Sequence, residues 1–383
     1  MKRTYSKCGL SVVTLYGVMG AVSGVLMGLI VGIGAAIMLA GEMNWLLQEA
    51  GRGDFGSIVR IIMDSDIMNF VIIGTVLGSV FGMGIGILIM RRILPEKNNI
   101  PIPKKNLSFP DFLLVIMMAF GLWGVGAFLG NLPEWFGIGL ENELFSSTRP
   151  VMILFHLYAI FGAPFFEELA FRKTLLDAAH PYGEIPAAFL SALLFGLMHG
   201  NSAQFLLAFT LGLLLSAVYM RTGRVIYTMF LHFMINLTAT VPSFFEMAGI
   251  NIDIPWYIVV GTLTVAGIVL LIIFRKKEFL SLSESAEPDP NASAFKNVGM
   301  RIAVIGGLVL IAGYEAIQFV GCIASGFGPE VLLRLVPLAL TVAVIILVLR
   351  LVGKPRSEAQ AMIPEMPQLN PQMNSEINPQ DNK

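Results

Sequence analysis

Charged residues are scarce in this chain: Lys, Arg, Asp and Glu make up 13% of its 383 residues, whereas soluble domains carry about 25%. Together with 56% hydrophobic residues and a mean hydropathy of +0.76, that scarcity excludes a water-soluble enzyme and a disordered regulator. The 25 basic residues are matched by 26 acidic ones, so nucleic acid is not an expected partner. Two cysteines, Cys8 and Cys322, are too few for a disulfide framework.

Long apolar stretches take the place of the missing charge. A transmembrane helix needs about 20 mostly apolar residues, and the chain offers ten candidates separated by polar or Pro/Gly-marked turns. We therefore predict an all-α, polytopic transmembrane helix bundle of about ten spans, surrounded by the lipid bilayer. The predicted spans are residues 11–40, 67–90, 112–129, 151–171, 185–199, 203–220, 225–240, 256–274, 302–322 and 335–351.

The basic residues of the loops predict the orientation. Four of the 25 fall on the loops of one side, which leaves 21 for the other side; the four are Arg52, Arg60, Arg149 and Arg334. Because Lys and Arg are retained in the cytoplasm, we expect both termini to be cytoplasmic.

Composition also divides the chain into five parts. We expect an N-terminal two-span hairpin with a basic cytoplasmic loop (residues 1–110) and a membrane core with the polar motifs (111–275). A cytoplasmic loop (276–300), a C-terminal two-span hairpin (301–352) and a disordered cytoplasmic tail (353–383) follow.

Glycines recur every fourth residue in the first two spans. Small residues at this spacing let two helix backbones approach closely in lipid. The favoured interpretation is packing within the N-terminal hairpin, and the alternative is a homo-oligomer contact through the first row. The rows are Gly20, Gly24, Gly28 and Gly32 in the first span, and Gly74, Gly78, Gly82 and Gly86 in the second.

Ionisable side chains within spans cost on the order of 2.5–3.5 kcal/mol each, so each one asks for an explanation. Most of them belong to three motifs on three predicted helices: Glu167-Glu168-x-x-x-Arg172, Phe195-x-x-x-His199 and His232-x-x-x-Asn236. Other ionisable residues are better explained by local roles: His156 by a bond to a neighbouring helix, His180 by a loop, and Glu315 by helix packing or a separate polar path.

Helical spacing separates the two glutamates. Glu168 and Arg172 lie four residues apart and can pair, whereas Glu167 is turned about 100° away and stays a free carboxylate. A free carboxylate, an imidazole from a second helix, and an imidazole plus a carboxamide from a third are the groups that activate a water and stabilise an oxyanion.

These three motifs, in this order on separate apolar helices, resemble the CPBP family of intramembrane glutamic proteases, which includes the CAAX prenyl endopeptidases and bacterial bacteriocin-processing and immunity-type members. The resemblance covers residues 151–240 and implies an endopeptidase with no cofactor, open to the cytoplasm, acting on a peptide or membrane-protein substrate in a bacterial cell membrane. It implies that Glu167 and His199 activate the water and that His232 and Asn236 hold the oxyanion. The supporting residues are Glu168, Arg172 and Phe195.

Two other classes use the same residue types. A proton-coupled or small-solute transporter also places carboxylates and histidines in spans, although no inverted repeat is evident here. A zinc metalloprotease could hold Zn²⁺ with a carboxylate and two imidazoles, although the helical His-Glu-x-x-His pair is absent.

Depth in the membrane poses a geometric problem for the catalytic hypothesis. Counted from the cytoplasmic ends of their predicted helices at about 1.5 Å per residue, Glu167 lies about 8 Å deep and His199 about 21 Å deep. The two levels match only if the fifth helix begins above the membrane surface or is strongly tilted.

Overall fold

The computed structural model describes residues 2–52, 67–94, 102, 104–136, 148–180, 183–280, 282, 298–324, 326 and 328–353. Within these ranges every regular element is a helix. In the described part of the chain nine helices are long and apolar enough to cross a membrane, and α9 (Glu184–Met198) is a shorter apolar helix. The predicted all-α transmembrane bundle is confirmed, with the fifth predicted span as its short member. Most of the predicted cytoplasmic loop 276–300 and nearly all of the predicted tail lie outside the described residues.

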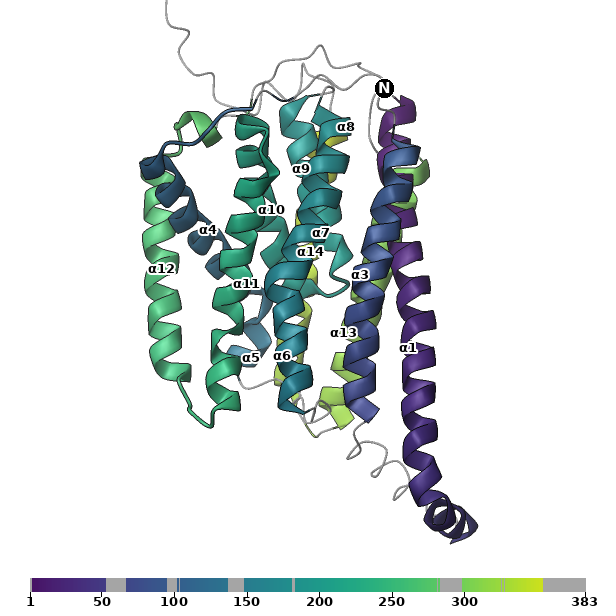
Figure 1. The fold of residues 1–383 in the computed structure, drawn as a ribbon. Helices are drawn as coiled ribbons and strands as arrows, with labels where there is room; N and C mark the ends of the chain where they lie inside the picture. Colours follow the sequence, from purple (N-terminus) through teal and green to yellow (C-terminus); the bar gives the residue numbers. More distant parts are fainter. Residues whose placement is uncertain are drawn as a thin grey trace, which may run out of the picture.

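Figure 1 shows the helices running side by side, with the N-terminus at the end of the bundle where α9 begins. The other elements, in chain order, are α1 (Lys2–Arg52), α3 (Ile67–Ile93), α4 (Phe109–Gly130), α5 (Leu132–Trp135), α6 (Arg149–Leu157), η3 (Tyr158–Gly162), α7 (Ala163–Glu168), η4 (Leu169–Leu176), α8 (Asp177–Ala179), α10 (Ser202–Thr222), α11 (Val225–Met247), α12 (Asp253–Ile273), η6 (Glu278–Leu280), α13 (Val298–Ala324), η8 (Pro329–Arg334) and α14 (Leu335–Gly353).

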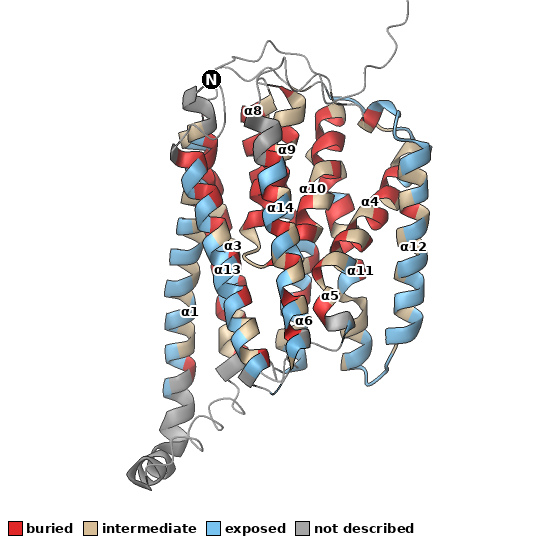
Figure 2. Ribbon diagram, turned by 180° about the vertical axis from the view of Figure 1, so that it is seen from behind, coloured by how far each residue is buried: buried red, intermediate tan, exposed pale blue. Residues whose placement is uncertain are grey.

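The centre of the bundle is formed by α9 and α10, most of whose residues are buried. Their buried faces belong to a core that also includes residues of α1, α3, η4, α13 and α14. Figure 2 shows these two helices mostly in red, whereas α12 at one edge of the bundle is largely pale blue. Because the exposed side chains of α12 are mainly apolar, its outer face suits lipid rather than water.

Glycines allow several helices to touch backbone to backbone. A Cβ added at Gly121 of α4 would lie 2.6 Å from the carbonyl carbon of Gly267 on α12. A Cβ at Gly9 of α1 would lie 2.5 Å from the carbonyl carbon of Gly299 on α13. Close approach of this kind supplies the van der Waals contact on which helix association in lipid depends.

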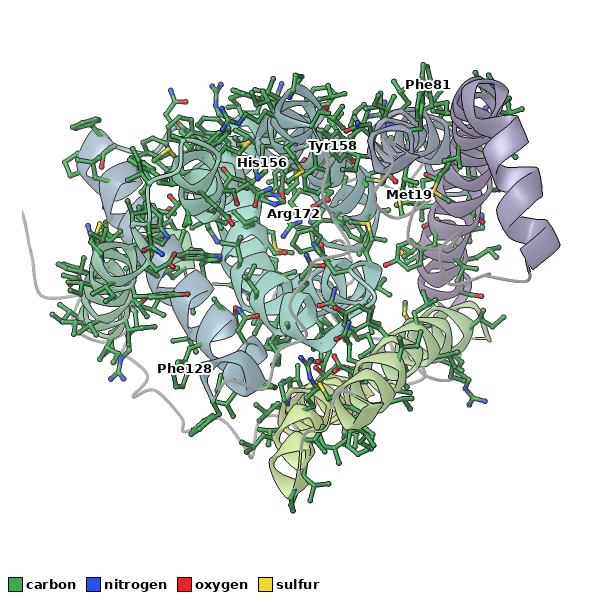
Figure 3. All side chains as sticks on the ribbon, turned by 90° about the horizontal axis from the view of Figure 1, so that it is seen from below. Met19, Phe81, Phe128, His156, Tyr158 and Arg172 are labelled. Carbon is green, nitrogen blue, oxygen red and sulfur yellow. The ribbon has the colours of Figure 1, made fainter. Side chains whose placement is uncertain are left out.

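The two glycine rows play different roles. A Cβ at Gly78 of α3 would lie 2.5 Å from the Cα of Ser23, and one at Gly82 would lie 2.8 Å from the Cα of Met19, so the second row packs on α1 as predicted. Figure 3, seen along the bundle, places Met19 on the side of α1 that faces α3. The first row is different: a Cβ at Gly20, Gly24, Gly28 or Gly32 meets nothing within 4 Å. Packing within the hairpin was therefore the wrong interpretation for the first row.

We expect Gly78→Leu to destabilise the protein and Gly24→Leu to be close to neutral in the isolated chain. Leucine at position 78 must displace the backbone of α1, and overpacking of this kind costs about 1–3 kcal/mol, whereas position 24 faces open space. The thermal midpoints of both variants in detergent check this difference. Equal midpoints would mean that the second row does not set the spacing of α1 and α3.

The fourth apolar segment is longer than predicted. Its helical run continues without a break from Arg149 to Ala179, eight residues beyond the predicted end at residue 171. Glu167 therefore lies twelve residues from the end of its helix, or about 18 Å, close to the depth of about 22 Å for His199 counted from Glu184. The predicted mismatch in depth came from the misplaced helix end, and no protruding fifth helix is needed to remove it.

Figure 1 places the beginnings of α4 and α9 and the end of α10 at the end of the bundle with the N-terminus, and charged side chains of these elements are paired. Lys277 Nζ lies 2.9 Å from Asp111 Oδ1, and Arg221 pairs with Glu184. The Lys105 ammonium donates to Glu278 Oε1 at 2.6 Å, and this hydrogen bond lowers the pKa of the exposed Glu278 carboxyl below its usual value.

Candidate active site

Pro164 widens the helix just before the two glutamates. Proline has no N–H and its ring clashes with the carbonyl four residues back, so a regular α-helical turn cannot form there. The preceding turn is the π-helical segment η3, in which the Ala163 N–H donates to the Tyr158 carbonyl. In the same register the carbonyl of Ala159 would need an N–H from Pro164, which has none. The helix is thus left with an open backbone acceptor.

Asn236 of α11 occupies this acceptor. Its Nδ2 donates to the Ala159 carbonyl at 2.8 Å, which ties α11 to the helix that carries Glu167. Asn236 was predicted to act with His232 on the same helix face. The hydrogen bond to Ala159 gives Asn236 a structural role as well. An asparagine side chain has two N–H donors on that nitrogen, so one remains for another acceptor.

A second π-helical segment, η4, follows the glutamates. The Thr174 hydroxyl donates to the Leu169 carbonyl five residues earlier, at 2.8 Å. Glu167 and Glu168 therefore sit at the end of the short α-helical segment α7, with a π-helical segment on each side. π-Helical turns are rare and occur frequently at functional sites.

Glu168 and Arg172 form a buried ion pair, as their spacing predicts. Glu168 Oε1 lies 3.1 Å from Arg172 NH1, and neither side chain is exposed. The guanidinium also donates from NH2 to the Gly212 carbonyl of α10 at 3.3 Å. Figure 3 shows Arg172 near the middle of the bundle. Its charge is thus surrounded by a carboxylate, a carbonyl dipole and an aromatic face, that of Phe195.

His232 lies between the two glutamates. Its Nδ1 is 3.1 Å from Glu168 Oε1, and its Nε2 is 3.8 Å from Glu167 Oε2. Helical spacing predicts that the two carboxylates face different ways, yet both lie within 4 Å of this one imidazole. Because a neutral imidazole has one N–H, only the protonated ring can donate toward both carboxylates at once.

Phe195 connects the remaining groups. Its ring has the Arg172 guanidinium carbon 4.5 Å from its centroid and the His232 ring edge-on with centroids 5.7 Å apart. The His199 ring is also edge-on, with centroids 5.2 Å apart. The ring of Phe195 thus has the Arg172 cation over its face and the two imidazoles against it. These contacts fix the relative positions of the helices that carry the three motifs. The structure therefore brings the three sequence motifs together.

The tautomer of His199 follows from its backbone contact. Its Nδ1 lies 3.0 Å from the carbonyl of Phe195, which can only accept a hydrogen bond. The proton of the neutral ring is therefore on Nδ1, and the lone pair is on Nε2. Nε2 is the nitrogen that could accept a proton from a water.

Two tyrosines beside Glu167 were missed by the sequence analysis. The negative charge of Glu167 acts on the hydroxyls of Tyr16 and Tyr158. Tyr158 lies on the same helical run and could have been found from its spacing, but Tyr16 belongs to α1, far from the motifs. The Tyr16 hydroxyl donates to the Leu194 carbonyl of α9 at 2.6 Å.

Within the described residues, no three His, Cys, Asp or Glu side chains are grouped so as to hold a metal ion. Arg172 next to Glu168 would also repel a cation placed between the two glutamates. The residues thus do not fit a zinc centre. His156 was predicted to bond a neighbouring helix, but its Nδ1 lies 2.7 Å from the Met152 carbonyl of its own helix, and only its ring packs on Phe244 of α11.

Comparisons with known proteins match the region that carries the site. Residues 149–238 match the family described as type II CAAX prenyl endopeptidase Rce1-like. Over 130 residues the chain is 30% identical to the putative membrane peptidase YdiL of Bacillus subtilis (strain 168). The aligned part makes up 30% of this chain and 53% of that protein. The chain therefore spans about half the length of the curated relative it matches. No solved structure matches.

The matched region contains all seven residues of the three motifs. The resemblance to CAAX-type membrane peptidases seen in the sequence is thereby confirmed over residues 149–238, and the chain is an integral, multi-pass membrane protein.

Proposed function

We propose that the protein is a membrane-embedded endopeptidase of the glutamic type. The observation that carries this proposal is the unequal partnering of the two adjacent carboxylates. Glu168 is neutralised by Arg172, whereas Glu167 makes no ion pair with Lys or Arg among the described residues and faces His232 at 3.8 Å. A purely structural network would gain little from a second carboxylate that no Lys or Arg neutralises.

In the proposed reaction Glu167, with His199 Nε2, removes a proton from a water as its oxygen bonds to the peptide carbonyl carbon. The carbonyl electrons move to the oxygen and form an oxyanion. When the C–N bond breaks, the same groups return the proton to the departing amine. One peptide bond and one water are consumed, and one carboxyl group and one amino group are formed.

The oxyanion is held by His232 and Asn236 in this proposal. Asn236 uses one N–H on Ala159 and offers the second, and a protonated His232 offers the N–H of Nε2. Glu168, which is paired with Arg172, supports His232 through the 3.1 Å contact between Glu168 Oε1 and His232 Nδ1. Phe195 keeps both imidazoles edge-on to one ring and so preserves their spacing.

Hydrolysis is tested directly with purified protein in liposomes. Peptides from membrane-protein segments and prenylated C-termini are offered in ¹⁸O-labelled water, and the products are read by mass spectrometry. The proposal requires new C-termini that carry one ¹⁸O. Uptake of a solute with no cleaved peptide would instead favour a transporter.

We expect hydrolysis to survive thorough chelation of divalent metals. A carboxylate and an imidazole activate water without a metal, and the described residues hold no metal-binding group. The rate is measured before and after dialysis against a chelator, and the metal content is determined by mass spectrometry. Stoichiometric zinc, with activity lost on its removal and restored by its return, would contradict the glutamic mechanism.

We further propose that the end of the bundle with the N-terminus is cytoplasmic, in a bacterial cell membrane, and that the site opens toward it. The excess of basic residues on that side supports this orientation. An impermeant maleimide added outside cells should label Asn251→Cys and spare Lys276→Cys, both at exposed positions. The native Cys8 and Cys322 are buried and give a low background. The reverse labelling pattern would invert the topology.

A further inference from the structure

The turn after His199 is irregular backbone inside the bundle. The helix α9 that leads to it has 15 residues and a length of about 22 Å, whereas the apolar core of a bilayer is about 30 Å thick. The turn therefore lies at membrane depth, and its buried polar groups need protein partners because lipid offers none.

Most backbone groups of this turn find local partners. The His199 N–H donates to the Gly196 carbonyl at 3.2 Å, and the Gly200 N–H donates to the Leu197 carbonyl at 3.3 Å. Asn201 donates to the His199 carbonyl through Nδ2 at 3.1 Å. Gly200 has a φ of +70°, a conformation that residues with a Cβ rarely adopt. The turn is thus closely specified up to Asn201.

Ser202 is the first residue of α10. Its hydrogen-bond partner, Glu315, lies outside residues 149–238, the region that matches the family. The backbone N–H of Ser202 lies 3.2 Å from Glu315 Oε1, and its hydroxyl donates to the same oxygen. Glu315 belongs to α13 and is buried, with 7% of its surface exposed. A carboxylate at the N-terminus of a 21-residue helix is stabilised by the helix dipole, which accounts for an acidic residue in the middle of an apolar span.

We propose that Glu315 is a positioning residue for His199. By holding Ser202 it fixes the C-terminal end of the turn whose first residue is His199, and so the depth and direction of His199 Nε2. The catalytic part of this inference rests on the function proposed above. A second contact holds α9 from outside the matched region, because Tyr16 of α1 donates to its Leu194 carbonyl.

A series of four variants tests this role: Glu315→Ala, Glu315→Gln, Ser202→Ala and Ser216→Ala. Ser216 is the matched control, because it is also a buried serine of α10 but its hydroxyl has no hydrogen-bond partner among the described residues. For each variant kcat and KM, the thermal midpoint, and hydrogen–deuterium exchange over residues 199–204 are measured in detergent.

Glu315→Ala should lower kcat about tenfold to a hundredfold with KM changed less than about twofold, since small misplacements of a catalytic group act mainly on turnover. Exchange over 199–204 should rise in the same variant. Glu315→Gln should restore most of kcat, because its amide oxygen can accept both bonds from Ser202. Ser202→Ala should lie between Glu315→Ala and wild type, and it serves as the test if Glu315→Ala does not fold. Ser216→Ala should match wild type.

The proposal is overturned if Glu315→Ala keeps the wild-type kcat and exchange, or if Glu315→Gln fails to recover activity. The exchange measurement separates this inference from the proposed function. If the wild-type protein cleaves no peptide while exchange over 199–204 still rises in Glu315→Ala, bracing of the turn is supported and the peptidase assignment is what fails.

Discussion

Glu167→Gln should abolish peptide hydrolysis while the protein stays folded. Glutamine keeps the shape of the side chain and its contact with His232 but cannot take a proton from water, so a loss of about 10²–10⁴-fold in kcat is expected. Because Glu167 has no Lys or Arg partner among the described residues, no cation is left unpaired by its removal. The rate of ¹⁸O-labelled product formation and the thermal midpoint are measured together.

A matched control for this variant is Glu246→Gln. Glu246 is an exposed carboxylate near the end of α11, so its removal tests the general effect of losing one negative charge. It should cleave at the wild-type rate. Turnover by Glu167→Gln at the rate of the control would remove Glu167 from the catalytic mechanism.

The second large effect concerns Glu168 and Arg172. Glu168→Gln should lower the activity and also lower the free energy of unfolding by about 3–5 kcal/mol. The stability is lost because the guanidinium of Arg172 stays buried without its counter-ion. Combining it with Arg172→Met should recover part of that loss, since both charges are then removed. The recovery should be incomplete, because methionine also gives up the bond to Gly212 and the position over Phe195.

The measurement is a double-mutant cycle of thermal midpoints in detergent for wild type, Glu168→Gln, Arg172→Met and the double variant. Glu167→Gln is included as the comparison and should change the midpoint little. Additive losses without any rescue would show that Glu168 and Arg172 are not energetically coupled, and the separate roles of the two glutamates would lose their basis.

The sequence predicted the apolar helices and the ion pair because both depend on local spacing. It misplaced the end of the fourth helix because the charged residues Arg172, Lys173 and Asp177 after Phe171 resemble a loop. In the structure these charges have partners: Lys173 pairs with Asp177 of the same helix at 2.6 Å, and Tyr219 of α10 donates to the Asp177 carboxylate at 2.7 Å. The contact from Tyr219 comes from another helix, and spacing along the chain cannot reveal it.

The same limit applies to the glycine rows and to Asn236. Spacing shows that a helix has a glycine face but not which neighbour faces it, so only one of two equivalent rows was placed correctly. The contact between Asn236 and Ala159 depends on an acceptor that Pro164 leaves open 72 residues earlier in the chain. Such a contact follows from tertiary structure alone.

The π-helical turns around the glutamates have a consequence for how this helix tolerates changes in length. A π-helical turn holds one residue more than an α-helical turn, so each of these segments behaves as a one-residue insertion accommodated in place. Deleting one residue within Tyr158–Gly162 would remove the extra residue of that turn and rotate the preceding helix by about 100° relative to the glutamates. His156 would then leave its contact with Phe244, while Glu167, Glu168 and Arg172 would keep their mutual register. The number of residues in η3 thus determines which face of α6 contacts α11.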